Sequence, residues 1–129
     1  MKKLFALVSS LLLAAVLFAN TGKVPDITQA DLQKAIAAKS VVVLDVNGSE
    51  SFAEGRIPGA IDYIANEAKL AALLPKDKKA LIVAYCGNEY CSAYQAAASA
   101  AVALGYTNVV HYKPGIDGWK KSGAKIEKS

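Results

Sequence analysis

The sequence predicts a single α/β domain with a mainly parallel central sheet and helices on both faces. Three apolar runs rich in β-branched residues lie at 41–46, 80–85 and 108–112, as is typical of strands that are buried on both faces. Helical patterns alternate with these runs, and this alternation favours a parallel sheet covered by helices. A chain of about 110 residues is the usual size of a domain with one core.

The first half of the chain predicts one helix and two strands. Residues 26–40 predict a helix, because Thr28 can cap its start and Asp31 follows three residues later. The strand over 41–46 comes next. A polar turn with one helical turn is expected over 48–55, and residues 57–64 lead into a short second strand.

The second half predicts three helices around two strands. Asn66 is expected to cap a helix that runs to Leu74. After the strand over 80–85, a helix over 92–104 is closed by Gly105 at its C-terminal cap. A last short helix follows the strand over 108–112. Parallel strands bring their C-terminal ends to one edge of the sheet, where α/β proteins place binding groups.

The N-terminus has the pattern of a secretory signal peptide over residues 1–19. Lys2 and Lys3 precede an apolar run from Leu4 to Phe18, which is shorter than the roughly 20 residues of a membrane-spanning helix. Residues 20–129 are then the mature domain, expected to be periplasmic or secreted and without stable membrane association. The 15 basic residues less Lys2 and Lys3 leave 13 against 11 acidic ones, which is too small an excess to indicate nucleic-acid binding.

The two cysteines, Cys86 and Cys91, flank the loop between a buried strand and a helix. Backbone N–H groups of such a loop can point at the Cys86 sulfur, favour its thiolate form and make it a better nucleophile. Gly87 and Asn88 tolerate positive φ and therefore suit a tight cradle. A purely structural disulfide stays an alternative. Zinc is disfavoured, because the cysteines and His111 supply three ligands where structural zinc takes four.

Three segments, in order, resemble the motifs of the rhodanese family and cover nearly the whole mature chain. They are L-D-V-N-G-S-E-S-F-A-E-G-R-I-P-G-A-I at 44–61, I-V-A-Y-C-G-N-E-Y-C-S-A-Y-Q-A-A-A-S-A-A-V-A-L-G-Y at 82–106, and N-V-V-H-Y-K-P-G-I-D-G-W-K-K-S-G at 108–123. The resemblance implies a single rhodanese-like domain that acts as a sulfurtransferase. Cys86 would take sulfane sulfur from thiosulfate or polysulfide and pass it to a thiol or a protein acceptor.

The resemblance also assigns the loop residues and implies no metal or organic cofactor. The loop that would hold the anionic sulfur comprises Gly87, Asn88, Glu89, Tyr90 and Ser92. Many active members carry a glycine where this chain has Glu89, and an arginine or lysine where it has Cys91. An arginine fork binds oxyanions in a bidentate way that neither residue can copy. Two alternatives therefore stay open: a sulfur carrier or protein-binding module without turnover, and a thiol–disulfide redox protein.

Other positions of the motifs are also substituted. Asn47 stands where the family has an arginine, Arg56 where it has a histidine, and Pro114 where it has a glycine. Asn47 and Lys113 are candidates for substrate binding at the edge of the sheet, although a solvated surface lysine is an equally good interpretation of Lys113. Asp45 is expected to order the loop after its strand by hydrogen bonds.

Cys91 also suggests a resolving role. A second thiol in the cradle could attack a Cys86 persulfide, expel sulfide and leave a Cys86–Cys91 disulfide. This requires Cα atoms within about 7 Å and converging side chains. The five-residue spacing motivates the hypothesis without establishing that geometry.

Overall fold

The computed structural model describes residues 23–129 and contains a four-stranded, all-parallel sheet with the strand order β2-β1-β3-β4. The strands are β1 (Val41–Asp45), β2 (Ile61–Asp62), β3 (Leu81–Tyr85) and β4 (Asn108–His111). Asp45 of β1 lies opposite Asp62 of β2 and Tyr85 of β3. The strand ends that were expected to gather the functional residues therefore meet at one edge, as predicted.

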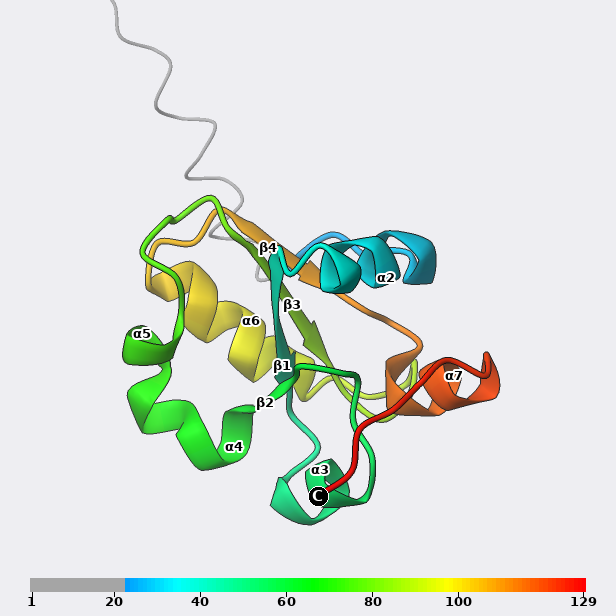
Figure 1. The fold of residues 1–129 in the computed structure, drawn as a ribbon. Coiled ribbons are helices and arrows are strands. Elements are labelled where there is room, and N and C mark those ends of the chain that lie inside the picture. The colour runs from blue at the N-terminus through cyan, green and yellow to red at the C-terminus, as the bar shows by residue number, and fades with distance from the viewer. Residues whose placement is uncertain (1–22) are drawn as a thin grey trace, which may run out of the picture.

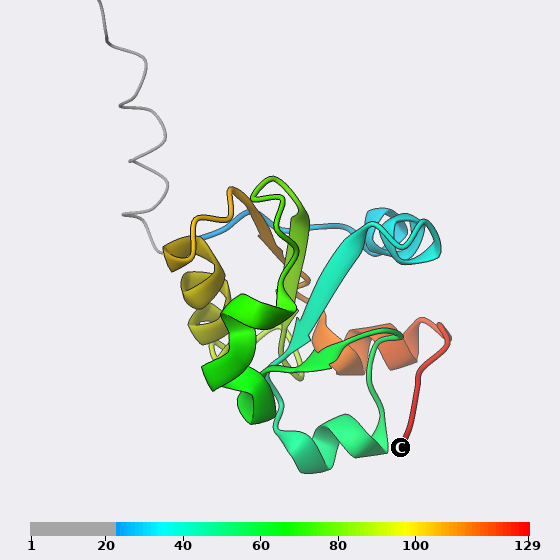
Figure 2. The same ribbon diagram turned by 60° about the vertical axis from the view of Figure 1, so that its left-hand side comes forward.

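The helices cover both faces of this sheet (Figures 1 and 2). Helix α6 lies on one face with the segment from α4 to α5, and α2 and α7 lie on the other. The predicted fold class is confirmed. The helical elements are α2 (Gln29–Ala37), α3 (Ser49–Glu54), α4 (Tyr63–Asn66), the 3-10 turn η1 (Glu67–Lys69), α5 (Leu70–Leu73), α6 (Tyr94–Ala103) and α7 (Gly115–Lys121).

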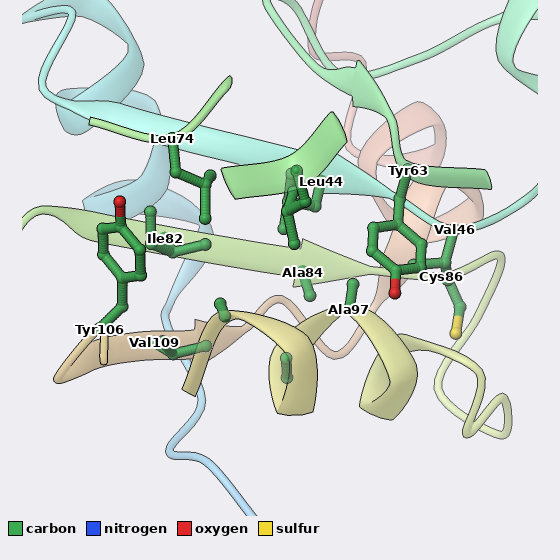
Figure 3. Packing of buried hydrophobic residues seen from close by; sticks show 13 residues of the cluster. Leu44, Val46, Tyr63, Leu74, Ile82, Ala84, Cys86, Ala97, Tyr106 and Val109 are labelled. Carbon is green, nitrogen blue, oxygen red and sulfur yellow. The ribbon is translucent and has the colours of Figure 1, made fainter. Parts of the chain in front are cut away.

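Two hydrophobic clusters, one on each face, hold the layers together. Side chains alternate along β3, so Ile82 and Ala84 belong to the cluster under α6, whereas Val83 and Tyr85 belong to the cluster under α2 and α7. Burial of one such large apolar side chain contributes about 1.5–3 kcal/mol. Cys86 ends the row on the α6 face, beside Val46 and Tyr63 (Figure 3). The candidate nucleophile is therefore built into the rim of the core.

Helix α6 shows why this part of the chain is rich in alanine. Its buried face consists of Ala97, Ala98 and Ala101, and such small side chains let the helix approach β3 and β4 closely. The helix begins at Tyr94, two residues later than predicted. Gly105 has φ +99° just beyond its end, which confirms the predicted glycine cap.

The other helix boundaries confirm one predicted cap and correct another. The Thr28 hydroxyl accepts the Asp31 N–H at 3.1 Å and starts α2, as predicted. Asn66 does not cap a helix, because its side chain instead donates to the Asp62 carbonyl at 2.9 Å. The helical segment starts earlier, at Tyr63, where the Asp62 carboxylate accepts the Ala65 N–H. The pattern at 66–74 concealed this earlier cap because Asp62 also ends β2.

The signal peptide expected over residues 1–19 lies outside the described residues. Among the helices of residues 23–129, none is long and apolar enough to cross a membrane. The segment just before α2 adds to the sheet edge in a way the sequence did not predict. Asp26 pairs with His111 in a parallel bridge, with hydrogen bonds of 2.8 and 2.9 Å on either side.

Candidate active site at the cysteine loop

Cys86 lies at the C-terminal end of β3, at the start of a loop that leads into α6. Its side chain is buried, with 1% of the residue exposed. The Tyr94 N–H, at the first turn of α6, donates to the Cys86 Sγ at 3.1 Å. A sulfur at the N-terminus of a helix is placed where negative charge is favoured. The backbone donor that was expected for the Cys86 thiolate is therefore present.

Cys91 lies across the loop and is joined to Cys86 as a disulfide, with Cα atoms 6.1 Å apart. The Cys91 N–H donates to the Asn88 carbonyl at 3.3 Å, which turns the chain back toward Cys86. The Ala93 N–H donates to the Cys91 Sγ at 3.4 Å. Both sulfurs thus lie against the first backbone N–H groups of α6. The geometric requirement of the resolving hypothesis is met.

Helix α7 fixes the first half of the loop through the backbone. The Ile116 N–H donates to the Cys86 carbonyl at 3.0 Å, and the Asp117 N–H donates to the Gly87 carbonyl at 2.9 Å. In a trans peptide the N–H points opposite to the carbonyl, so the N–H groups of Gly87 and Asn88 point away from α7. Within residues 23–129, the N–H groups of Gly87, Asn88 and Glu89 have no hydrogen-bond acceptor. They are donors available to an anion.

Gly115 makes the close contact between α7 and the loop possible. Its φ is +67°, and a Cβ at this position would lie 2.6 Å from the Cys86 carbonyl oxygen and 2.8 Å from the Asn88 nitrogen. No side chain fits there. The glycine therefore lets the first turn of α7 reach the loop carbonyls.

The neighbouring loop after β1 is held by a buried carboxylate. Tyr85 donates its hydroxyl proton to Asp45 Oδ2 and accepts the Ile57 N–H at 3.1 Å. Asp45 Oδ1 accepts the Asn47 N–H at 2.8 Å, which confirms that Asp45 orders its loop. Burial raises the pKa of Asp45 above its ordinary value, while the hydrogen bonds from Tyr85 and Asn47 oppose that rise. Burial beside Asp45 also raises the pKa of Tyr85 far above its ordinary value.

Asn47 lies against the cysteine loop. Its side-chain oxygen is 3.5 Å from where a Cβ on Gly87 would lie. The Asn47 amide nitrogen is buried and makes no hydrogen bond of normal geometry, although it is near enough to Asp45 to favour the ionised carboxylate. A polar group left unpaired beside the loop could serve a bound anion. The structure thus places Asn47 at the edge that holds Cys86, and its role in substrate binding stays a prediction.

Lys113 lies farther out, on the wall of a surface hollow of about 610 Å³. Asn88, Glu89 and Tyr90 line one side of this hollow, and Lys113, Asp117 and Lys121 line the other. The two lysines are balanced by two carboxylates, so the hollow has no excess positive charge. Neither cysteine lines it. Lys113 therefore adjoins the loop without forming part of the cradle around Cys86.

Arg56 and His111 have structural contacts of their own. The Arg56 guanidinium donates to the Phe52 carbonyl and the Ser129 hydroxyl, both at 2.9 Å, and lies over the Phe52 ring. These bonds fix the C-terminal segment. His111 is buried and stacks on the Tyr94 ring, with its Nδ1 3.4 Å from an Asp26 carboxylate oxygen. Burial lowers the pKa of His111, and Asp26 opposes this effect.

Sequence reasoning expected a backbone donor for the Cys86 sulfur without assigning it to Tyr94, and it gave Gly115 no role in the loop. Tyr94 acts through its backbone N–H, and a side-chain pattern carries no signal for that. Gly115 could have been found, because a glycine directly after a proline at a strand end indicates positive φ or close backbone approach. Ser92, which was assigned to the loop, is exposed and accepts the Gln95 N–H through its carbonyl at 3.0 Å.

Fold and loop together define an α/β protein with a buried cysteine at the end of a parallel strand and a helix N-terminus directed at its sulfur. The family model of the rhodanese-like domain matches residues 28–122. The chain belongs to the rhodanese-like domain family, as the resemblance of its motifs implied.

Known relatives agree with this assignment. The uncharacterized protein YibN of Escherichia coli K12 is 31% identical over 116 residues, which cover 84% of this chain and 78% of YibN. The rhodanese-like domain of an Anabaena protein superposes with a TM-score of 0.65 at 20% identity, covering 81% of this chain and 80% of that domain. A human single-domain sulfurtransferase superposes with a TM-score of 0.58 at 22% identity, covering 75% of this chain and 96% of the human chain. The two structures show the shared fold.

Proposed function

We propose that this protein is a sulfurtransferase that carries sulfane sulfur as a persulfide on Cys86. In the first step, the Cys86 thiolate attacks the outer sulfur of a small anion such as thiosulfate or polysulfide, the S–S bond of that anion breaks, and sulfite or a shorter polysulfide leaves. In the second step, a thiol or a protein acceptor takes the outer sulfur of the persulfide. This is nucleophilic catalysis in two displacement steps, and both steps pass through an anionic sulfur at the loop.

The observation that carries the proposal is the backbone donor to the Cys86 Sγ at the start of α6, with further N–H groups in the adjoining loop. Tyr94 already donates to that sulfur, and the N–H groups of Gly87, Asn88 and Glu89 are without acceptors in the described part of the chain. In a persulfide the outer sulfur carries the negative charge, which such donors can stabilise. The family assignment supports the same chemistry, since one structural relative is a sulfurtransferase.

The donor set favours small polarisable sulfur anions over strongly charged oxyanions. Thiosulfate carries charge on sulfonate oxygens, and in other family members a basic loop residue holds the anionic substrate; here that position is Cys91, which lies beside α6. Backbone N–H groups supply partial charges only. Polysulfide is therefore the preferred donor in this proposal, and thiosulfate a slower one. The apolar run at the N-terminus supports a periplasmic or extracellular location for this reaction.

The test locates sulfur on the reduced mature protein. Wild type, Cys86→Ser and Cys91→Ser are incubated with polysulfide or thiosulfate without oxygen, and the modified residue is found by mass spectrometry. We expect Cys91→Ser to gain sulfur on Cys86 and Cys86→Ser to gain none. Cyanide should then remove that sulfur as thiocyanate. Loading without transfer to cyanide or thiols would identify a carrier, and loading that survives Cys86→Ser would refute the proposal.

A further inference from the structure

We infer that Cys91 is the resolving thiol of this site. It attacks the Cys86 persulfide, releases hydrosulfide and leaves the Cys86–Cys91 disulfide, which a dithiol reductant reopens. This inference rests on the proposed function, because it begins from the Cys86 persulfide. It makes the domain a sulfide-forming persulfide reductase in addition to a transferase.

The first support is that the bridge and the backbone contacts that hold the loop occur together in one structure. The Cα atoms of Cys86 and Cys91 are 6.1 Å apart, within the range of about 4.4–6.8 Å found for disulfides. In this same arrangement α7 donates to the carbonyls of Cys86 and Gly87, and Tyr94 donates to the Cys86 Sγ. The disulfide is therefore compatible with the contacts that hold the loop.

The second support is that both sulfurs have a backbone donor. The Cys86 Sγ accepts from Tyr94 at 3.1 Å, and the Cys91 Sγ accepts from Ala93 at 3.4 Å. Both donors belong to the start of α6, a helix of ten residues. Each cysteine can therefore act as an attacking or a leaving thiolate, which thiol–disulfide exchange requires of both partners.

The chemical step balances within the site. The Cys91 thiolate attacks the Cys86 Sγ, a bond forms between the two Sγ atoms, and the bond to the outer sulfur breaks. That sulfur takes the bonding electron pair and the proton released by the Cys91 thiol, and it leaves as hydrosulfide. The sulfane sulfur is reduced by two electrons and the two cysteines are oxidised by two. From thiosulfate and two thiols, the products are sulfite, hydrosulfide, one proton and the disulfide.

Exposure of the two sulfurs decides how the disulfide is reopened. Cys86 is 1% exposed, whereas Cys91 is half-buried. The first thiolate of a dithiol reductant therefore attacks the Cys91 Sγ, and Cys86 leaves as a thiolate that Tyr94 stabilises. The second reductant thiol then frees Cys91. Tyr90, which is 88% exposed, offers the reductant a ring to pack against directly beside Cys91.

A purely structural role explains this bridge less well. A disulfide that closes so short a loop restricts the unfolded chain little and adds little stability. It also occupies the family nucleophile, which is unnecessary for a staple. A bridge that forms and opens during the reaction accounts for both its position and its uneven exposure.

The experiment follows one equivalent of polysulfide, without oxygen or added thiol, on reduced wild type, Cys91→Ser, Cys91→Ala and Cys86→Ser. Intact mass and peptide mapping distinguish a persulfide from a disulfide. We expect wild type to end as the disulfide, both Cys91 variants to hold a persulfide on Cys86, and Cys86→Ser to stay unmodified. The lifetime of the wild-type persulfide should be at least about tenfold shorter than that of the Cys91→Ser persulfide, because the resolving step is intramolecular.

The outcomes separate the two proposals. Equal persulfide lifetimes in wild type and both Cys91 variants would overturn the resolving role and leave the proposed function standing. Absence of a Cys86 persulfide in both Cys91 variants would overturn the proposed function itself. Added dithiol should reduce the wild-type disulfide and restore a second round of hydrosulfide release, and failure to restore it would contradict recycling.

Discussion

The loop after β1 and the loop after β3 lie side by side at one edge of the sheet, but they use their hydrogen-bonding groups differently. In the β1 loop, the Asp45 carboxylate accepts hydrogen bonds from the Asn47 N–H and the Tyr85 hydroxyl. In the β3 loop, α7 donates to the carbonyls of Cys86 and Gly87, and the N–H groups of Gly87 and Asn88 have no acceptor among residues 23–129. The first arrangement builds a rigid support, and the second leaves donors for a sulfur anion.

The largest effect is expected from Gly115→Ala, which acts on the β3 loop. The added Cβ would meet the backbone of Cys86 and Asn88 at 2.6–2.8 Å, so the loop must shift. A shifted loop would no longer align its backbone N–H groups with the sulfur anion. Loss of one aligned donor should slow sulfur loading about hundredfold. Loading of Cys86 in the reduced protein is measured by mass spectrometry.

Gly123→Ala is the matched control for that variant. Gly123 has φ +82°, but a Cβ there meets nothing within 4 Å. It should cost about 1–2 kcal/mol of stability from backbone strain alone and leave the loading rate unchanged. Equal loading rates in the two glycine variants would show that contact between α7 and the loop is unimportant.

The second effect concerns stability and the β1 loop. Tyr85→Phe removes the hydroxyl that links Asp45 to the Ile57 N–H. Two buried groups then lose a partner, which should lower the free energy of unfolding by about 1–3 kcal/mol. Urea unfolding measures this change. The rate of Cys86 loading should stay within about twofold of wild type, which corresponds to a change of less than about 0.5 kcal/mol in the activation free energy.

Tyr112→Phe is the control for Tyr85→Phe. Tyr112 is also fully buried, but its hydroxyl donates to the side-chain oxygen of Gln29 at 3.0 Å, and Gln29 is partly exposed. Water can replace that partner, so the loss should be smaller, about 0.5–1 kcal/mol. A larger loss in Tyr112→Phe than in Tyr85→Phe would contradict the supporting role given to Asp45.

The third effect crosses from one loop to the other. Asn47→Asp places a carboxylate against the cysteine loop, near Gly87, where it repels an anionic sulfur. Loading should slow about tenfold, which corresponds to about 1.4 kcal/mol. Asn108→Asp makes the same charge change at the exposed start of β4 and should leave the rate unchanged. The loading rates of the two variants are compared in quenched reactions with polysulfide. Equal rates would contradict a role of Asn47 in the site.

The smallest effect is a pH dependence of stability. Because burial raises the pKa of Asp45 above 3.8, the folded protein binds the proton more tightly than the unfolded chain. This contribution is fully present below pH 3.8 and is lost as the pH rises through the folded-state pKa. Wild type should therefore lose stability relative to Asp45→Asn over this range. A difference in stability between the two proteins that does not change with pH would contradict the raised pKa of Asp45.

Much of this comparison could be predicted from the sequence. The runs at 41–46 and 80–85 predicted strands whose ends meet at one edge, and the position of Cys86 between a strand and a helix predicted backbone donors. The loop residues and Asn47 followed from the family motifs. These signals are local, so one segment of sequence carries each of them.

The remaining features depend on contacts between distant segments. The bond from Tyr94 to the Cys86 sulfur uses a backbone N–H, which any residue except proline could supply. The contact of α7 with the loop is visible only through Gly115. The Asn66 cap was wrong because Asp62 and Asn66, within five residues, are both candidate caps. Asp62, which is held in place by its pairing with β1, caps the helix. Tertiary contacts decide such cases, and local patterns do not encode them.

The most direct measurement is the rate of alkylation of Cys86 against pH in reduced Cys91→Ser, where it is the remaining cysteine of the chain. Backbone donors at the start of α6 should favour the thiolate, so the half-maximal rate should fall at a pH well below about 8.5, the ordinary value for cysteine. A half-maximal rate at or above that pH would show that the loop does not stabilise an anionic sulfur, and would contradict the account.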